Sequence, residues 1–141
     1  YSGIGTMTLA LAEKAKQVYG VEIVAPAIEN AKENAALNQI ENIDFEVADA
    51  GEWLVKKAKE DFKVDVVVVD PPRKGLSPDF IDAVLKIQPD KIVYVSCNPN
   101  TLARDLKLLH AGGYTIEKVQ PVDMFPMTHH IESITLLVKE Q

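Results

Sequence analysis

The segment VDVVVVDPPRKG, residues 64–75, decides the fold class of this 141-residue chain. Its nearly uninterrupted run of valines is typical of a strand that is buried on both faces of a parallel sheet. The two prolines after Asp70 cannot continue such a strand, so the chain leaves the sheet there in a rigid loop. The segment therefore predicts a parallel α/β sheet with a polar loop at the carboxyl end of one strand.

The sequence on either side of this segment alternates between strand and helix patterns. Strands are predicted over residues 18–23, 45–47, 64–69, 91–96, 115–119 and 133–138. Apolar residues at helical spacing predict helices over residues 6–16, 27–37, 52–59 and 78–86, and from residue 98 to the glycines at 112–113. Ser77 and Pro78 are typical of a helix start. This alternation predicts a doubly wound, mostly parallel sheet that closes with two adjacent strands.

The chain opens on a glycine turn, YSGIG at residues 1–5, without a strand pattern before it. In α/β folds such a turn follows a buried strand. We therefore expect residues 1–141 to form one domain that is truncated at its N-terminal side, with the first strand of the sheet upstream of Tyr1.

The composition is that of an ordinary globular domain, with 47% hydrophobic residues, 26% charged residues and a formal net charge of −6. No run approaches the roughly 20 apolar residues of a membrane span, and there is no signal-peptide pattern. A single cysteine excludes an internal disulfide, which agrees with a reducing, cytoplasmic setting. No Lys/Arg cluster is long enough for a nucleic-acid arm, so any RNA binding must use a local patch or another part of the protein.

Residues that could bind a ligand recur where the predicted strands end. Ligands of open α/β sheets bind beyond the carboxyl ends of the strands, where the loops converge. We therefore predict a binding site formed by the residues at these ends, which are Gly3, Glu22, Asp49, Asp70 and Cys97.

The first three of these residues are typical of nucleotide binding. A glycine turn lets the backbone approach a ligand closely, and Glu22, about twenty residues later, can accept hydrogen bonds from both ribose hydroxyls. Asp49 could accept from an adenine amino group, although a solvated loop position explains it better. A nicotinamide nucleotide and S-adenosylmethionine would give the same pattern, and a plain tight turn with an exposed acid also fits.

Cys97 is the only cysteine of the chain, and it stands between a strand and a helix start. Free cysteines are most often small buried hydrophobes. The amides at a helix N-terminus, however, favour the reactive thiolate, so we interpret Cys97 as a nucleophile. Arg104 and Asp105, further along that helix, fit structure and substrate positioning equally well.

His129, His130 and Glu132 lie just before the last predicted strand. Adjacent histidines point apart, and no second ligand pair has suitable spacing, so we predict no metal site. A general base is the better role for Glu132, with a solvated loop acid as the alternative.

Four stretches together resemble the RNA uracil-5-methyltransferases, which use S-adenosylmethionine to make 5-methyluridine. They are YSGIG (1–5), DPPR (70–73), SCNP with TLARD (96–99 and 101–105), and DMFP with HIES (123–126 and 130–133). VVDPPRKGL and VQPVDMFP are similar to the branch that modifies 23S ribosomal RNA, and transfer RNA is the alternative substrate. The resemblance spans essentially the whole chain and implies a Rossmann-like class I methyltransferase fold.

The resemblance also implies a mechanism and its residues. The Cys97 thiolate would add to carbon 6 of uracil, and Glu132 would remove the proton from carbon 5 after methylation. Tyr1, Glu22 and Asp70 match cofactor contacts, and Thr6 is a weaker candidate. The chain lacks an RNA-binding N-terminal region and an upstream cofactor-contacting glutamine that the family has.

Two positions depart from the family pattern. Ser2 stands where cysteine is common, and Met127 stands where histidine is frequent. Neither change removes a catalytic role. Two other functions remain open from the residues alone: a nicotinamide-dependent oxidoreductase, and a non-catalytic binding module in which Cys97 is inert packing.

Overall fold

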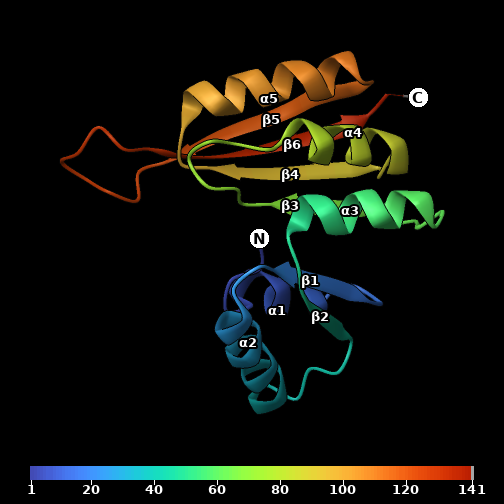
Figure 1. Cartoon of the computed structure of the whole chain (residues 1–141). Coiled ribbons are helices and arrows are strands. Elements are labelled where there is room, and N and C mark those ends of the chain that lie inside the picture. Colours follow the sequence, from blue (N-terminus) through green and yellow to red (C-terminus); the bar gives the residue numbers. More distant parts are fainter. Residues whose placement is uncertain (141) are drawn as a thin grey trace. The chain divides into compact units, whose positions relative to one another are not determined.

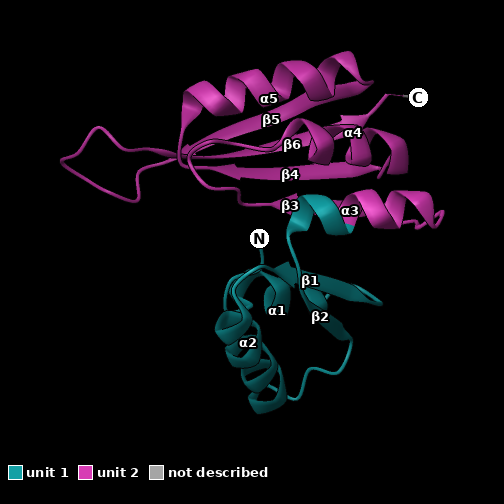
Figure 2. Ribbon diagram, viewed as in Figure 1, with its two compact units in different colours: residues 1–53 teal, residues 54–141 magenta. Residues whose placement is uncertain are grey.

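The computed structural model describes residues 1–140, which alternate between helices and strands as Figure 1 shows. In chain order the elements are α1 (Thr6–Ala12), β1 (Val18–Glu22), α2 (Ala25–Leu37), β2 (Ile43–Val47), α3 (Ala50–Lys59), β3 (Val66–Val69), α4 (Pro78–Ile87), β4 (Lys91–Ser96), α5 (Pro99–Ala111), β5 (Tyr114–Val122) and β6 (Glu132–Lys139). The chain divides into two compact units, Tyr1–Trp53 and the part from Leu54 onwards (Figure 2).

The first unit contains a two-stranded parallel sheet. β1 pairs with β2 in a register that runs from Val18 opposite Ile43 to Glu22 opposite Val47. Helices α1 and α2 pack against these strands, and α2 buries Ile28, Ala31 and Ala35 on one face. This spacing of three and four residues is the one that aligns side chains along a helix.

The second unit contains a four-stranded sheet in the order β3-β4-β6-β5. β3 and β4 are parallel, whereas β6 runs antiparallel to both of its neighbours. One face of β4 and β6 is buried, because the residues that pair across it are all buried: Ile92 with Leu137, Tyr94 with Thr135, and Ser96 with Ser133. The Tyr94 hydroxyl reaches Asp105 on α5, so this is the face that α5 covers.

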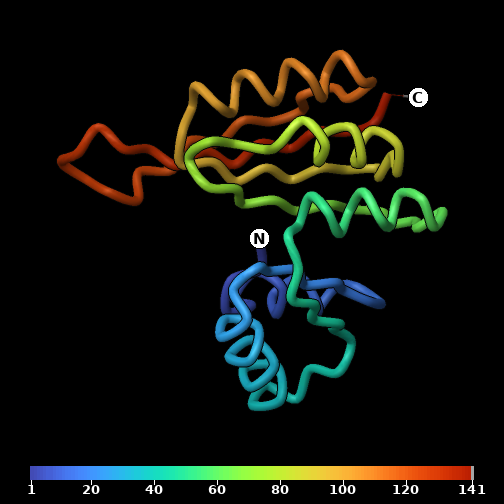
Figure 3. The backbone as a smooth tube through the Cα atoms, viewed as in Figure 1, coloured from blue at the N-terminus to red at the C-terminus, as the bar shows by residue number. Residues whose placement is uncertain are grey.

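A long loop, residues 123–131, joins β5 to β6. It projects beyond the ends of the sheet strands, and the backbone trace of Figure 3 follows it out of β5 and back into β6. Within residues 1–140 no helix has both the length and the apolar character needed to cross a membrane.

The structure confirms most of the expected elements. The strand predicted over residues 91–96 coincides with β4, and Ser77 caps α4, its Oγ accepting from the Phe80 amide at 3.2 Å. The expected pair of late strands is present, as adjacent strands β5 and β6. The α/β class with parallel pairs is therefore confirmed, with antiparallel pairing added where the chain ends.

The helix expected over residues 6–16 is shorter than predicted and ends at Ala12. The reason is a contact that the local pattern does not contain. The side-chain amide of Asn42 donates to the carbonyl oxygens of Ala12 and Ala15, at 2.9 and 2.8 Å, and satisfies them outside a helix.

The buried face of β6 yields a stability prediction. Leu137 has no exposed surface, whereas Ile134 lies on the opposite face of the strand and is 41% exposed. Leu137→Ala should lower the free energy of unfolding by about 2–5 kcal/mol, because it leaves a cavity in a close-packed layer. Ile134→Ala is the matched control and should have a much smaller effect. Urea titration followed by circular dichroism measures both, and equal losses would contradict this account of the core.

Candidate active site

The pairing of β4 with β6 brings Cys97 and Glu132 together. Ser96, the last residue of β4, lies opposite Ser133. In an antiparallel pair the next step of the register moves forward on one strand and backward on the other, so Cys97 falls opposite Glu132. Residues opposite each other in such pairs have their Cβ atoms roughly 5 Å apart. Two side chains that are 35 positions apart in sequence thus become neighbours.

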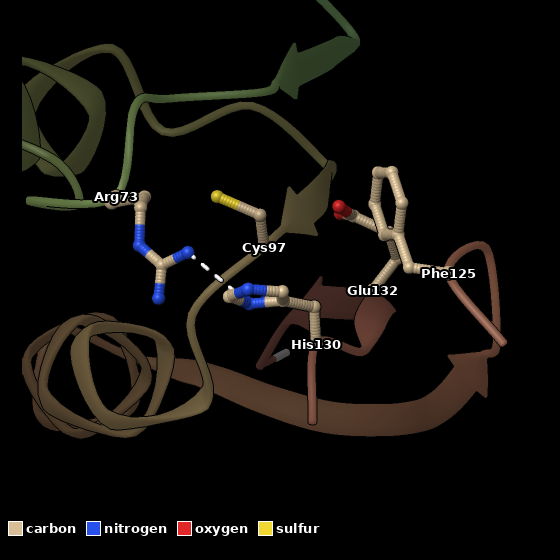
Figure 4. Close-up of a pocket in the computed structure, with 5 residues that line it drawn as sticks. All are labelled: Arg73, Cys97, Phe125, His130 and Glu132. Carbon is tan, nitrogen blue, oxygen red and sulfur yellow. Dashed lines mark hydrogen bonds between the residues drawn. The ribbon is translucent and has the colours of Figure 1, made fainter. Parts of the chain in front are cut away.

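Both side chains line one small pocket of about 210 Å³ (Figure 4). The pocket residues are Arg73, Cys97, Phe125, His130 and Glu132. Cys97 and Glu132 are each half-buried, so the sulfur is not sealed in the core. The pocket is smaller than the roughly 300–1,000 Å³ of sites for drug-sized ligands.

The loop after β3 carries Arg73 to this pocket. The turn closes with the Gly75 amide donating to the Pro72 carbonyl at 2.8 Å. Asn98 and Thr101, at the start of α5, then hold the loop from the other side. The Asn98 side-chain amide and the Thr101 hydroxyl both donate to the Arg73 carbonyl, at 3.0 and 3.1 Å. The segment that follows Cys97 therefore anchors the loop that carries Arg73.

Asp105 completes this anchoring from the interior. Its side chain has no exposed surface, and its Oδ2 accepts from the Leu76 amide at 2.8 Å and from the Tyr94 hydroxyl at 2.7 Å. Arg104 donates through Nε to Asp105 Oδ1 at 2.8 Å and through Nη2 to the Lys74 carbonyl at 3.0 Å. The structure thus places Asp105 in a buried network. Of the two roles that the sequence allows, structure and substrate positioning, this network gives Asp105 the structural one.

Burial and the neighbouring carboxylate explain the titration behaviour of Tyr94. Removing the phenol from water raises its pKa, and the hydrogen bond to the Asp105 carboxylate raises it further. The hydroxyl therefore stays protonated and remains a permanent donor to Asp105.

Gly75 has to be glycine for this network to form. Its φ angle is +77°, in the left-handed region, and a Cβ there would lie 2.5 Å from Asp105 Oδ2 and 2.7 Å from Arg104 Nη2. Any side chain at this position would be strained and would push the loop off its anchor.

The first unit gathers a second set of predicted residues around Glu22, the last residue of β1. Its carboxylate accepts from the amides of Gly3, Ile23 and Val24 at 3.0, 2.9 and 3.2 Å. Partial burial opposes ionisation and raises the pKa of Glu22, but these amide hydrogen bonds and the positive charge of the N-terminus outweigh it and leave the pKa below its ordinary value. Glu22 is therefore an ionised acceptor at neutral pH.

The glycine turn lies beside this carboxylate. The Ser2 amide donates to the Val21 carbonyl at 2.9 Å, so Tyr1 and Gly3 lie next to the end of β1. Thr6 is the first residue of α1 and is exposed. Asp49 follows β2, and its Oδ1 accepts from the Gly51 and Glu52 amides at 2.8 and 3.1 Å. Asp49 thus caps the start of α3, which gives it a structural role whether or not it also binds a ligand.

The remaining predicted residue, Asp70, lies in the second unit. It follows β3 directly, is exposed, and is not among the five residues that line the Cys97 pocket. Within residues 1–140 no group of three or more His, Cys, Asp or Glu side chains is arranged to hold a metal ion.

Sequence reasoning assigned no function to three of the pocket residues. Arg73, Phe125 and His130 come from two loops that are separated by about fifty residues. All three stand within the DPPR, DMFP and HIES stretches, and for His130 the sequence also raises, and rejects, a metal-ligand role. The approach of Phe125 and His130 to Cys97 depends on the loop between β5 and β6, and no local pattern predicts it.

The fold defines the class of protein. The chain has the fold of the class I S-adenosylmethionine-dependent methyltransferases. It is similar to the crystal structure of a tRNA (uracil-54, C5)-methyltransferase from Pyrococcus abyssi in complex with S-adenosyl-L-homocysteine, with a TM-score of 0.83 and 40% identity over 98% of this chain and 33% of that one. An rRNA methylase from Streptococcus thermophilus matches with a TM-score of 0.78, over 100% of this chain and 84% of that one; at 13% identity it shows the fold alone.

The particular family follows from the sequence comparisons. The tRNA (uracil-5-)-methyltransferase family model matches residues 1–140, and the chain belongs to this family. It is 56% identical over 97% of its length to an uncharacterized RNA methyltransferase of Listeria monocytogenes, and 55% identical over 99% of its length to one of Enterococcus faecalis. The chain spans about 30% of the length of these relatives.

The Asp105 network yields a second prediction. Asp105→Ala leaves the Leu76 amide and the Tyr94 hydroxyl buried without their acceptor, and each such group costs about 1–3 kcal/mol. We expect a loss of about 3 kcal/mol in the free energy of unfolding, measured by urea titration. Tyr94→Phe should cost about 1 kcal/mol in the parent protein but should be neutral or stabilising in the Asp105→Ala background, because it removes the hydroxyl that has lost its acceptor.

Asp82→Ala, an exposed acid on α4, is the control for loss of charge. A loss below 1 kcal/mol for Asp105→Ala, or equal Tyr94→Phe effects in both backgrounds, would show that the carboxylate does not hold the loop.

Proposed function

We propose that this chain is the catalytic part of an enzyme that transfers a methyl group from S-adenosylmethionine to carbon 5 of a uridine in RNA. The observation that carries the proposal is the pocket shared by Cys97 and Glu132. A thiol and a carboxylate at one small cavity are the nucleophile and base that substitution at an unreactive ring carbon requires. Membership of the uracil-5-methyltransferase family supports the choice of base and carbon.

Cys97 acts first in this mechanism. Its thiolate forms a bond to carbon 6 of uracil, the electron pair of the carbon 5–carbon 6 double bond moves to carbon 5, and negative charge spreads onto the oxygen at carbon 4. Carbon 5 then becomes nucleophilic enough to accept a methyl group; a sulfonium donor would lose its sulfur–methyl bond in this step and leave as a neutral thioether. The covalent step divides one difficult substitution into easier ones.

Glu132 completes the reaction. After methylation its carboxylate takes the proton from carbon 5, the electron pair of that bond restores the carbon 5–carbon 6 double bond, and the carbon–sulfur bond breaks to return the thiolate. One proton leaves the ring for the methyl group gained, so the atoms balance. A base inside a stacked RNA helix is out of reach of this pocket, so the target uridine must be unstacked or flipped out.

We assign the methyl donor to the turn around Gly3 and to Glu22. The φ angle of Gly3 is +54°, and a Cβ there would meet nothing within 4 Å, so the backbone borders open space. A carboxylate has about four lone-pair sites, and the three amides on Glu22 leave capacity for a ribose hydroxyl. S-adenosylmethionine, when bound, supplies a sulfonium methyl group. Further proposed contacts, taken from the predicted site, are Tyr1, Thr6, Asp49 and Asp70.

Ribosomal RNA is the substrate that we propose, because VVDPPRKGL and VQPVDMFP resemble the branch that modifies it. Transfer RNA is the second candidate, because the Pyrococcus abyssi enzyme at 40% identity is a tRNA (uracil-54, C5)-methyltransferase. Methylation assays with the two RNA transcripts side by side distinguish them.

The RNA-binding surface of the whole protein lies mainly outside this chain in our proposal. A net charge of −6 is unfavourable for phosphate contacts, and the chain spans about 30% of the length of its relatives. All functional tests therefore use the full-length protein.

The two alternatives from the sequence have less support. A nicotinamide oxidoreductase does not agree with membership of a methyltransferase family. If the chain were a binding module with an inert cysteine, nothing would require the Cys97 side chain to line a pocket beside a carboxylate.

Trapping with 5-fluorouridine RNA tests the catalytic roles. Fluorine cannot leave carbon 5 as a proton does, so the parent protein should stall as a covalent adduct that survives denaturing gel electrophoresis. Cys97→Ala should give no adduct. Glu132→Gln should still form it, and should also accumulate an adduct with ordinary uridine RNA, because the last step is blocked. An adduct that persists in Cys97→Ala would refute the assignment of the nucleophile.

Calorimetry with S-adenosylmethionine tests the cofactor assignment. Glu22→Gln removes a charged hydrogen-bond acceptor worth about 1.5–3 kcal/mol, so the dissociation constant should rise roughly 10- to 100-fold. Glu29→Gln on α2, an exposed acid that pairs with Lys32 at 3.5 Å, is the matched control and should leave it unchanged. Equal affinities for the parent protein and Glu22→Gln would place the ribose elsewhere.

A further inference from the structure

Arg73 and His130 form a polar wall of the Cys97 pocket, and the role that we assign to them rests on the proposed function. Arg73 and His130 come from different loops and meet there, with Arg73 Nη1 3.3 Å from His130 Nδ1 (Figure 4). Phe125 packs edge-on against the His130 ring, with centroids 6.4 Å apart. The imidazole is thus held between a guanidinium and an aromatic ring.

The contact determines which hydrogen-bonding groups this wall offers. A guanidinium carries N–H donors and no acceptor. Nδ1 of His130 must therefore be the acceptor of the pair, which puts the imidazole proton on Nε2. The free groups of the pair are then the Nε2–H of His130 and the remaining N–H groups of Arg73. All of them are donors.

The other residues of the pocket have different tasks. Cys97 and Glu132 act on carbons 6 and 5 of the ring, and Phe125 is apolar. Arg73 and His130 are the remaining polar residues among the five that line the pocket. The pair is therefore the part of this wall that can meet the oxygen or nitrogen at carbon 4, next to the reacting carbon 5.

Uracil and cytosine differ at that position. Uracil carries a carbonyl oxygen, which accepts hydrogen bonds, whereas cytosine carries an amino group, which donates them. A wall of donors can hydrogen-bond the carbon 4 oxygen of uracil, but it would place donors against the carbon 4 amino group of cytosine. Sites built to hydrogen-bond a polar group discriminate strongly against analogues that leave the site unpaired.

We propose that the Arg73–His130 pair reads the carbon 4 oxygen of the target base and excludes cytidine from the pocket. The same donors face the oxygen onto which charge spreads when Cys97 adds to carbon 6. They stabilise that charge in place, because the pair is already oriented by its own contact. The pair thus contributes to both base choice and the rate of the covalent step.

The test compares two RNAs that differ only at the target, one with 5-fluorouridine and one with 5-fluorocytidine. Both rings can be trapped at carbon 6, so the ratio of the two trapping rates measures base choice. The parent protein should strongly prefer 5-fluorouridine. Arg73→Gln and His130→Gln each introduce a side-chain carbonyl that can accept from an amino group, and each should reduce the preference about tenfold or more.

Alkylation of Cys97 by iodoacetamide without RNA is the second readout. A role in base reading leaves this rate within about twofold of the parent rate, because no target base is present in this reaction. His110→Gln is the matched control, since His110 stands in the last turn of α5 and does not line the pocket. It should change neither the preference nor the alkylation rate.

The outcomes distinguish failure of the proposed function from failure of the base-reading role. Parent protein that traps neither RNA would refute the proposed function itself. Normal trapping with an unchanged preference in both Gln variants would overturn the base-reading role alone. A fall in alkylation that matches the fall in trapping would show that Arg73 acts on the thiol, and would also overturn it.

Discussion

The antiparallel register of β4 and β6 is the constraint on which the rest of the candidate site depends. Because Ser96 pairs with Ser133, the residues just beyond them, Cys97 and Glu132, must face each other at the end of the sheet. A slip of one residue in either strand would turn one side chain to the opposite face. The buried face of these strands resists such a slip, since Tyr94 and Leu137 would then leave the core. Core packing and the geometry of the candidate site are therefore specified by the same hydrogen-bond ladder.

The helix after Cys97 extends this order to the neighbouring loop. Asn98 caps α5, and Thr101, Arg104 and Asp105 lie along its first turns. Together these four residues bind backbone groups of residues 73–76. Such a loop has no regular partners of its own, and an unanchored Arg73 would sample many positions. Burying the Asp105 carboxylate is costly unless it is fully hydrogen-bonded, and the amide, hydroxyl and guanidinium donors meet that requirement. The same contacts give Arg73 a defined place at the pocket.

Much of the fold could be read from local sequence, and part of the site could not. β4 and α4 were predicted to within one residue because a short apolar run and a Ser-Pro helix start carry strong local signals. The predicted end of α1 was wrong, because the observed end depends on Asn42, which is thirty residues away from Ala12. Cys97 and Glu132 could be proposed from their motifs. Their meeting in one pocket, and the contribution of Arg73 and His130, required the pairing of distant strands and loops.

By itself the sequence determined which elements form and which residues can carry chemistry, because propensity, capping and residue type are properties of short segments. It determined that one thiol follows a strand and that a carboxylate precedes another. The tertiary structure decided which of these groups share a pocket, that Asp105 is an interior anchor, and that His130 lies beside Arg73. These features arise from contacts between segments far apart in the chain, and register and packing, rather than local pattern, set such contacts.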